Sequence, residues 1–155
     1  MVQSVIVIGA GIVGAATALQ LAKAGHAVKI VQAGGADATA ASFGWINASF
    51  FLNDDHHNLR AAGIAAWHRV LQEVSAPVLW HGCLCWDMDP GEMAATYAQL
   101  RAFDYPVEIL KKKQIQAREP ALRRSPDEAL FFPSEGAASS ADLARHFLSA
   151  TQGLG

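Results

Sequence analysis

Cysteine is nearly absent from this sequence, and so is the ligand pattern of a metal site. The 2 cysteines, Cys83 and Cys85, stand two positions apart, so their side chains would point to the same face of a strand. A structural zinc site needs about four ligands, and no second cysteine pair is present. We therefore expect two buried thiols in a reducing compartment and no bound metal.

An excess of positive charge is also lacking. The chain has 12 Lys and Arg against 14 Asp and Glu, and its longest basic run is Lys111 to Lys113. We interpret this triplet as a solvated turn and expect no nucleic-acid partner. The hydrophobic fraction of 52% is enough for a core, and 155 residues fit one globular domain of ordinary size.

Charge is missing altogether between Ser4 and Ala22, a stretch that approaches the length of a membrane span. However, no Lys or Arg precedes it, as a signal peptide would require, and the first cation is Lys23. Three glycines interrupt it at a spacing that has a different explanation. We therefore expect a soluble, cytoplasmic protein.

That explanation is a βαβ nucleotide-binding unit. Val5 to Ile8 is a β-branched run that predicts a strand buried inside a parallel sheet and covered by helices. The G-x-G-x-x-G spacing follows at once. Gly9 permits the tight turn, Gly11 allows a pyrophosphate to approach the backbone, and Gly14 allows the helix to lie close to the strand. The predicted helix ends near Gly25.

The start of this helix predicts an anion site. Its free N–H groups, including those of Ile12 and Val13, and the helix dipole suit a pyrophosphate. A second strand is predicted over residues 27–31. An Asp or Glu that holds the ribose hydroxyls usually follows such a strand, but Gln32 stands here, beside Ala33. Gln32 can still accept one hydroxyl, so we expect a weakened site.

The sequence after Gln32 bears on which dinucleotide binds. A glutamine does not repel a 2′-phosphate, so NADP is an alternative, but NADP would favour a nearby Arg or Lys. Residues 33–38 contain neither. This argues against NADP.

Several later stretches, taken in order, carry a resemblance to a known family. They read ATAASFGWINA, AAWHRV, HGCLCWD, AREPAL and FFPSEGAA. With the glycine motif, the chain resembles the FAD-dependent amine and amino-acid oxidoreductases of the D-amino-acid oxidase superfamily. This superfamily includes glycine oxidase, sarcosine oxidase and D-amino-acid dehydrogenase. The likeness runs over almost the whole chain.

The resemblance implies FAD as the cofactor and a loop that runs along it after the second strand. It assigns cofactor contacts to Ala40, Ala41, Ser42, Gly44, Trp45 and Ile46. From the residues alone, Trp45 could equally be a core aromatic and Asn47 a turn or cap residue. The flavoprotein reaction that the resemblance implies is hydride transfer from the carbon bearing nitrogen to the flavin.

Periodicity and breakers predict the remaining elements. Adjacent histidines His56 and His57 cannot share a helical face as metal ligands, so we interpret them as solvated helix-start residues. Helices are predicted over residues 56–74 and 140–152 and from Pro90 towards Phe103, and a further helix is predicted to end at Glu119-Pro120. Strands are predicted over residues 77–86, 107–110 and 129–132.

The fold class predicted is α/β: a Rossmann-like FAD-binding βαβ unit with part of an α+β substrate domain, apparently truncated. We expect an FAD-binding segment at residues 1–75, a partial substrate domain at 76–135, and a helix that returns to the FAD domain at 136–155. With so few parallel strands, one face or edge of the sheet should stay uncovered.

The function predicted is the N-terminal FAD-binding part of an oxidoreductase acting on small amines or amino acids. No residue receives a catalytic role; Glu73, Asp87, Asp89 and Glu92 are interpreted as solvated carboxylates. We expect the isolated chain to be inactive, and to associate with itself or with a second-half subunit. The alternatives are a non-catalytic truncated or split-gene chain and an NAD(P)-binding module.

Overall fold

The structure is a computed structural model that describes residues 1–35 and 37–154. Ala36 and Gly155 lie outside the described residues. Ala36 belongs to the stretch that lacks a cation for NADP, and Gly155 is the last residue of the segment predicted to return to the FAD domain. The chain divides into two compact units. Unit 1 comprises residues 1–45, 65–79 and 137–155, and unit 2 comprises residues 46–64 and 80–136.

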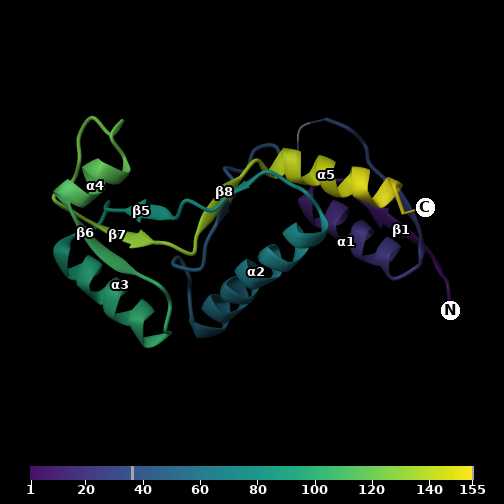
Figure 1. The fold of residues 1–155 in the computed structure, drawn as a ribbon. Coiled ribbons are helices and arrows are strands. Elements are labelled where there is room, and N and C mark those ends of the chain that lie inside the picture. Colours follow the sequence, from purple (N-terminus) through teal and green to yellow (C-terminus); the bar gives the residue numbers. More distant parts are fainter. Residues whose placement is uncertain (36, 155) are drawn as a thin grey trace. The chain divides into compact units, whose positions relative to one another are not determined.

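Unit 1 contains the predicted βαβ unit (Figure 1). β1 (Ser4–Ile8) pairs in parallel with β2 (Ala27–Val31), in a register that places Val7 opposite Ile30. α1 (Ile12–Lys23) connects them. The turn after the helix contains Gly25 with φ of +82°, a conformation that favours glycine, so the predicted helix end is confirmed.

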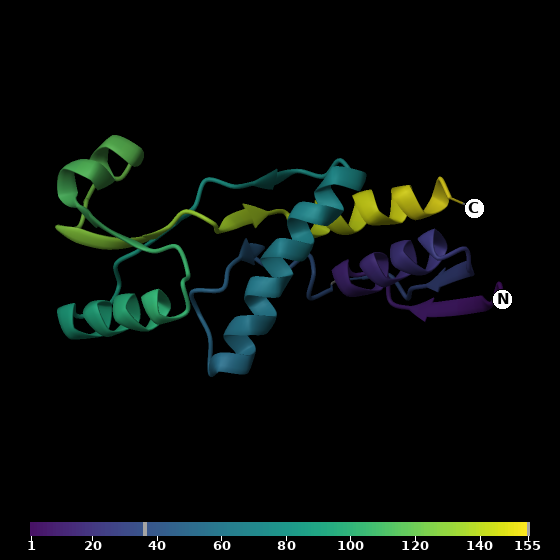
Figure 2. The same cartoon turned by 60° about the horizontal axis from the view of Figure 1, so that its bottom comes forward.

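The core of unit 1 lies between α1 and α5 (Ser140–Gln152), which run side by side in Figures 1 and 2. Ser139 caps α5, because its hydroxyl accepts the N–H of Asp142 at 3.3 Å. The helix therefore begins where the sequence predicts. The buried side chains that pack together here are Ala15, Leu19, Val74, Ala144 and Phe147.

The second face of the β1–β2 sheet is exposed. Val7 is buried, but Ile6 and Ile8 are 63% and 87% exposed, because successive strand side chains alternate between faces. The expectation that the apolar run of β1 is covered on both faces is therefore wrong for the described residues. The expectation of an uncovered face is confirmed.

α2 (Asp54–Glu73) begins two residues before the predicted start at residue 56, with the side chain of Asn53 accepting the N–H of His56 at 2.9 Å. Two interpretations of this helix are wrong. Leu59, whose helical spacing with Ile64, Trp67 and Leu71 predicts a place on the apolar face, is 72% exposed. His57, which was interpreted as solvated, is buried at 3% exposure. His57 stacks on Phe103 with 4.3 Å between ring centroids, which explains its burial.

Unit 2 is built on an antiparallel sheet in the order β5-β7-β6. Side chains of the central strand alternate between two helices. Leu130 and Phe132 pack with Met93 and Leu100 of α3, whereas Ala129 and Phe131 pack with Ile115 of α4. The elements of this unit are β5 (Cys83–Cys85), α3 (Pro90–Ala102), β6 (Glu108–Lys111), α4 (Lys112–Arg118) and β7 (Glu128–Phe132).

Three short strands complete the structure, in the order β3-β8-β4. β3 (Trp45–Ile46) and β8 (Gly136–Ala138) were not expected from the sequence. The predicted strand at 77–86 divides into β4 (Val78–Leu79) and β5. The mixed α/β fold class is confirmed. Within the described residues, no helix is both long and apolar enough to cross a membrane.

The charged residues that were interpreted as solvated are exposed. Asp89 and Glu92 form a capping box at the start of α3, with bonds of 2.8 and 3.0 Å. Glu73 forms an ion pair with Lys23. Two lysines of the basic triplet also form ion pairs, Lys111 with Glu128 and Lys112 with Asp127. Exposed pairs of this kind contribute about 1 kcal/mol or less.

Candidate functional site

The glycine loop between β1 and α1 is held in a tight turn. Gly9 has φ of +102°, and its N–H donates to the carbonyl of Val31 at 2.8 Å. A Cβ at Gly14 would lie 2.0 Å from the carbonyl oxygen of Gly9. Only glycine therefore permits this close approach of the helix to the end of β1.

Thr39 lies directly over this loop and was missed in the sequence. Its hydroxyl accepts the N–H of Ile12 at 3.0 Å, so one of the two helix donors predicted to face an anion already has a partner. A Cβ at Gly11 would lie 2.6 Å from the same oxygen. The hydroxyl retains a proton that it can donate. No local sequence signal marks this role, because Thr39 stands 27 positions after Ile12.

A cavity of about 470 Å³ opens beside the loop, between the ends of β1 and β2. The volume falls within the usual range of ligand pockets. The side chain of Asp37 lines it and accepts the N–H of Ala40 at 2.7 Å, which shapes the turn. The cavity brings together the predicted residues Gly9, Gly11, Gln32 and Ala33.

The segment from Ala40 to Ile46 continues away from this cavity and does not line it. Ala40, Ala41 and Ser42 are exposed. Gly44 has φ of +65°, and a Cβ there would lie 1.8 Å from the carbonyl oxygen of Ala138. This glycine therefore permits the approach of β8, whose Ala138 N–H donates to Gly44 at 3.0 Å. Trp45 and Ile46 form β3 and are half-buried.

A buried polar cluster follows immediately, in unit 2. Glu135 is fully buried, and its Oε1 accepts the N–H groups of Ala48 and Ser49 at 3.1 and 2.9 Å. The same oxygen accepts the hydroxyl of Tyr105 at 2.9 Å. Charge-assisted bonds of this kind are stronger than neutral ones. The sequence offered no signal for this role, since a lone glutamate before a glycine usually reads as surface.

Asn47 belongs to the same segment and is buried at 6% exposure. Arg60 of α2 donates two hydrogen bonds to Asn47: from Nε to the Asn47 carbonyl oxygen at 3.0 Å, and from Nη2 to the Asn47 side-chain Oδ1 at 2.6 Å. His57 contacts the carbonyl of Ala48 through Nδ1 at 3.0 Å. The start of α2 and Glu135 therefore fix the backbone of residues 47–49 from both sides.

Burial raises the pKa values of three groups near this cluster. It raises the pKa of the Cys83 thiol to about 11, with further contributions from the Glu135 carboxylate and Cys85. It also raises the pKa of Cys85, and that of the Tyr105 hydroxyl. Both cysteines are free and half-buried, and both pack against the α3 side of the sheet, so the predicted shared face is confirmed. At neutral pH these thiols are protonated and unreactive.

Comparison with known proteins identifies the relatives of this chain. The family model described as FAD dependent oxidoreductase (DAO) matches residues 4–155. Among curated proteins, no sequence matches the chain.

Solved structures with similar folds are longer than this chain. Glycine oxidase from Geobacillus kaustophilus is 25% identical with a TM-score of 0.84, and the alignment covers 99% of this chain and 44% of that one. Iminodiacetate oxidase from Chelativorans is 23% identical with a TM-score of 0.84, covering 100% and 45%. L-α-glycerophosphate oxidase from Mycoplasma pneumoniae, solved with FAD bound, is 17% identical with a TM-score of 0.80, covering 99% and 44%. The chain therefore spans less than half the length of these proteins.

Proposed function

Because the chain belongs to the family of FAD dependent oxidoreductases, we propose that it supplies the FAD-binding βαβ segment of an enzyme that oxidises amines or amino acids. The observation that carries this proposal is the glycine loop with its adjoining cavity of about 470 Å³. The residues around the loop fit an ADP-containing cofactor in shape and in charge.

The loop suits a pyrophosphate for steric and electrostatic reasons. A Cβ at Gly11 would collide with the Thr39 hydroxyl, so glycine keeps the backbone accessible at this point. The first-turn N–H groups of α1 lack intrahelical acceptors. The positive end of the helix dipole lies at the same point. Gly9, Gly11, Val13 and Gly14 would hold the pyrophosphate. Ile12 would act through Thr39, because its N–H donates to the Thr39 hydroxyl, which can donate in turn.

Gln32 and Ala33 lie at the end of β2 on the same cavity. In this position the side-chain oxygen of Gln32 can accept one ribose hydroxyl. Ala40, Ala41, Ser42, Gly44, Trp45 and Ile46 would follow the flavin half of the cofactor. This second assignment rests on the resemblance of their segment to the family.

FAD, when bound, supplies the chemistry by accepting a hydride from the carbon that bears nitrogen. The residues of this chain would bind and orient it, and none of them receives a catalytic role. We propose that residues 1–75 and 136–155 belong to the FAD-binding domain and residues 76–135 to a substrate domain. The glycine oxidase and iminodiacetate oxidase relatives support amines and amino acids as the substrate class.

NADP is the second candidate, because one observation favours it. Lys29 shares a second cavity, of about 570 Å³, with Gln32, and could provide the cation that residues 33–35 and 37–38 lack. A carboxylate that would repel a 2′-phosphate is missing at position 32.

The test is an equilibrium titration of the pure chain with FAD, FMN, NAD and NADP, each followed by calorimetry. FMN has the flavin but lacks the ADP half. We expect FAD to bind, and FMN and the nicotinamide cofactors to bind at least about tenfold more weakly. Binding of NADP without FAD would replace the proposal with a nicotinamide-binding module. Equal binding of FMN and FAD would show that the glycine loop does not recognise the ADP half.

A further inference from the structure

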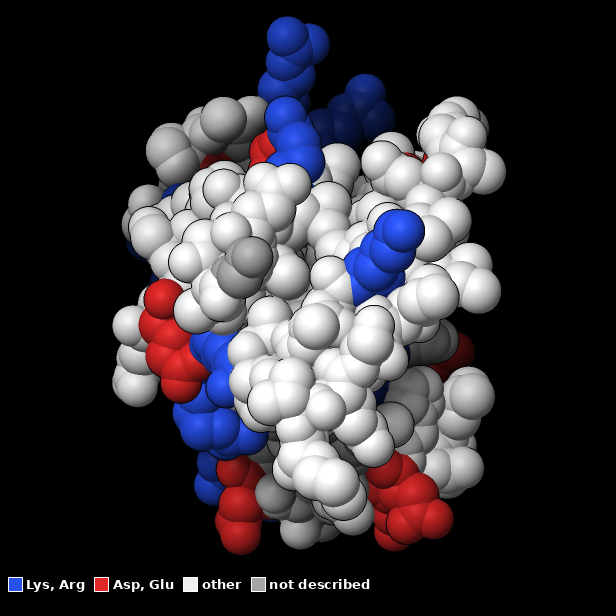
Figure 3. All heavy atoms as spheres, turned by 90° about the vertical axis from the view of Figure 1, so that its right-hand side faces the viewer, with Lys and Arg blue, Asp and Glu red and all other residues white. Residues whose placement is uncertain are grey.

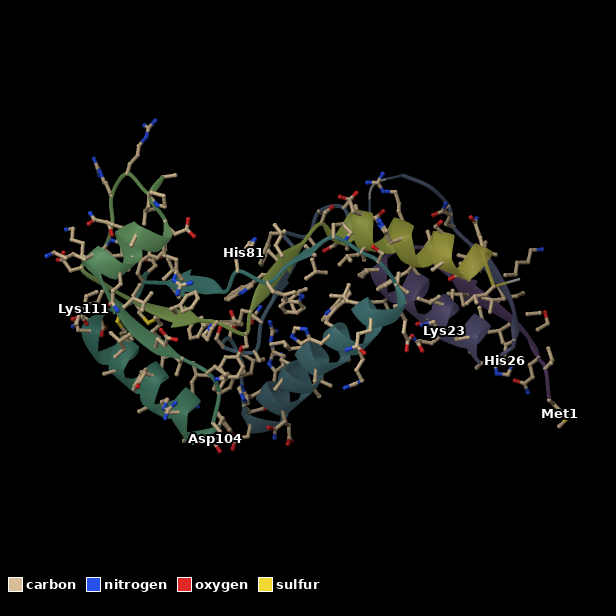
Figure 4. The ribbon with its side chains drawn as sticks, viewed as in Figure 1. Met1, Lys23, His26, His81, Asp104 and Lys111 are labelled. Carbon is tan, nitrogen blue, oxygen red and sulfur yellow. The ribbon has the colours of Figure 1, made fainter. Side chains whose placement is uncertain are left out.

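Two sequence stretches that the FAD site does not use come together around a cavity in unit 2. The cavity measures about 350 Å³. HGCLCWD supplies one wall, through Leu84 and Trp86. AREPAL supplies the other, through Arg118, Glu119 and Leu122, and Phe131 of β7 closes it. Figure 4 labels His81 on the segment that enters β5, at the rim of this cavity.

Arg118 places a positive charge at this cavity, on a guanidinium group with several N–H donors. Its guanidinium carbon lies 3.9 Å from the centroid of the Phe131 ring, which orients the planar group by a cation–π contact. The neighbouring Lys111 and Lys112 pair with carboxylates. Across the described parts of the chain, by contrast, Arg118 forms no ion pair. The paired N–H donors of its guanidinium group therefore remain available to bind a carboxylate.

The rest of the cavity is largely apolar and aromatic. Phe131 is 4% exposed, so its ring forms a firm wall, and Trp86 is 39% exposed at the opening. Gly82 permits the close approach of β5 to this ring, since a Cβ there would lie 2.4 Å from Phe131. Aromatic walls of this kind contact flat, apolar groups well. A single cation above such walls selects a ligand with one anionic group and an apolar body.

We propose that this cavity binds a small aromatic monocarboxylate. The carboxylate would pair with the Arg118 guanidinium, and the ring would lie between Trp86 and Leu122. Glu119 on the same rim disfavours a second carboxylate by like-charge repulsion. All of these residues belong to unit 2, so the site needs no flavin.

The experiment uses phenylacetate as the probe, with the whole chain and no added FAD. Calorimetry and amide chemical-shift mapping measure binding, with 2-phenylethanol as the uncharged probe and homophthalate as the dicarboxylate. We expect saturable binding of phenylacetate, with shifts at Leu84, Trp86 and Leu122, and weaker binding of both other probes. Arg118→Gln should weaken phenylacetate binding about tenfold, and Arg118→Lys by less, since the charge remains.

Arg101→Gln is the matched control, because Arg101 is an exposed arginine in the last turn of α3 as Arg118 is in that of α4. It should leave phenylacetate binding unchanged, and circular dichroism should confirm that each variant is folded. The proposal is overturned if phenylacetate does not saturate at millimolar concentration, if 2-phenylethanol binds equally, or if Arg118→Gln and Arg101→Gln have the same effect. FAD titration of the same preparation separates this outcome from that of the proposed FAD site.

Discussion

At the scale of single residues, Gly11 is the position on which the proposed pyrophosphate site depends most. The space that a side chain would fill lies 2.6 Å from the Thr39 hydroxyl, directly over the helix start. We predict that Gly11→Val abolishes FAD binding and leaves the circular dichroism spectrum unchanged, because branched carbon atoms would occupy the place of the phosphate. FAD titration measures this.

Gly63→Val is the control for that variant. Gly63 lies in α2, where an added Cβ would meet no atom within 4 Å. The control should bind FAD like the original chain. Unchanged FAD affinity in Gly11→Val would place the pyrophosphate elsewhere.

A substitution at Gln32, in contrast, is predicted to increase the affinity for FAD. Gln32→Glu should tighten FAD binding several-fold, because a charge-assisted bond to a ribose hydroxyl is worth about 1 kcal/mol more than a neutral one. The same titration of Gln99→Glu, an equal charge change on the exposed face of α3, controls for net charge. If both variants behave alike, or if Gln32→Glu binds more weakly, then Gln32 does not contact the ribose.

At the scale of elements, Glu135 joins the segment that leads into α2 to the end of β7. We predict that Glu135→Ala lowers the free energy of unfolding by about 3 kcal/mol, because Ala48, Ser49 and Tyr105 all lose this acceptor within a buried site. Glu135→Gln should lose less, since its amide oxygen can still accept. Urea unfolding measures both.

Glu128→Ala serves as the control, because Glu128 pairs with Lys111 on the surface. Its effect should stay within about 0.5 kcal/mol. A loss in Glu135→Ala no larger than this would mean that the buried cluster does not stabilise unit 2.

The elements also indicate how far the sequence could predict the structure. β1, α1, β2 and α5 were predicted close to their observed ends. Strong local signals mark the first of them, above all the β-branched run of β1 and the glycines that flank α1. β3 and β8 were missed because each is a short strand whose existence depends on a distant partner. His57 and Glu135 were missed for the same reason, since their burial comes from Phe103, Tyr105 and the backbone of residues 48–49.

The candidate site divides in the same way. The glycine motif predicted the loop and its cavity, because each glycine has a steric role that spacing reveals. Thr39 could not be predicted, because its contact with Ile12 spans 27 positions, across α1, β2 and the loop after them. The cavity at Arg118 likewise combines stretches that lie far apart in the sequence.

At the scale of the whole molecule, the uncovered face of the β1–β2 sheet predicts association. Ile6, Ile8 and Val31 are 63%, 87% and 46% exposed on these strands. Figure 3, which shows the side of the molecule at the right of Figure 1, also has broad areas without charged side chains. Exposed apolar strands of this kind favour contact with another chain. We predict that the chain self-associates, as measured by sedimentation velocity over a range of concentrations.

Replacing Ile6 and Ile8 together by Lys should shift that equilibrium towards the monomer. Leu59→Lys is the control, because Leu59 is 72% exposed on α2, away from this sheet face. A chain that stays monomeric at every concentration, or a control that dissociates equally, would show that the β1–β2 face is not the interface.

The measurement that tests the central claim most directly is the number of FAD molecules bound per chain at saturation. Equilibrium dialysis against FAD, with flavin absorbance and protein concentration read on the same sample, provides it. The account predicts about one FAD per folded chain, since the described residues contain one glycine-rich loop of this kind, at the N-terminus of α1. A folded chain that takes up no FAD at saturating concentration would contradict it.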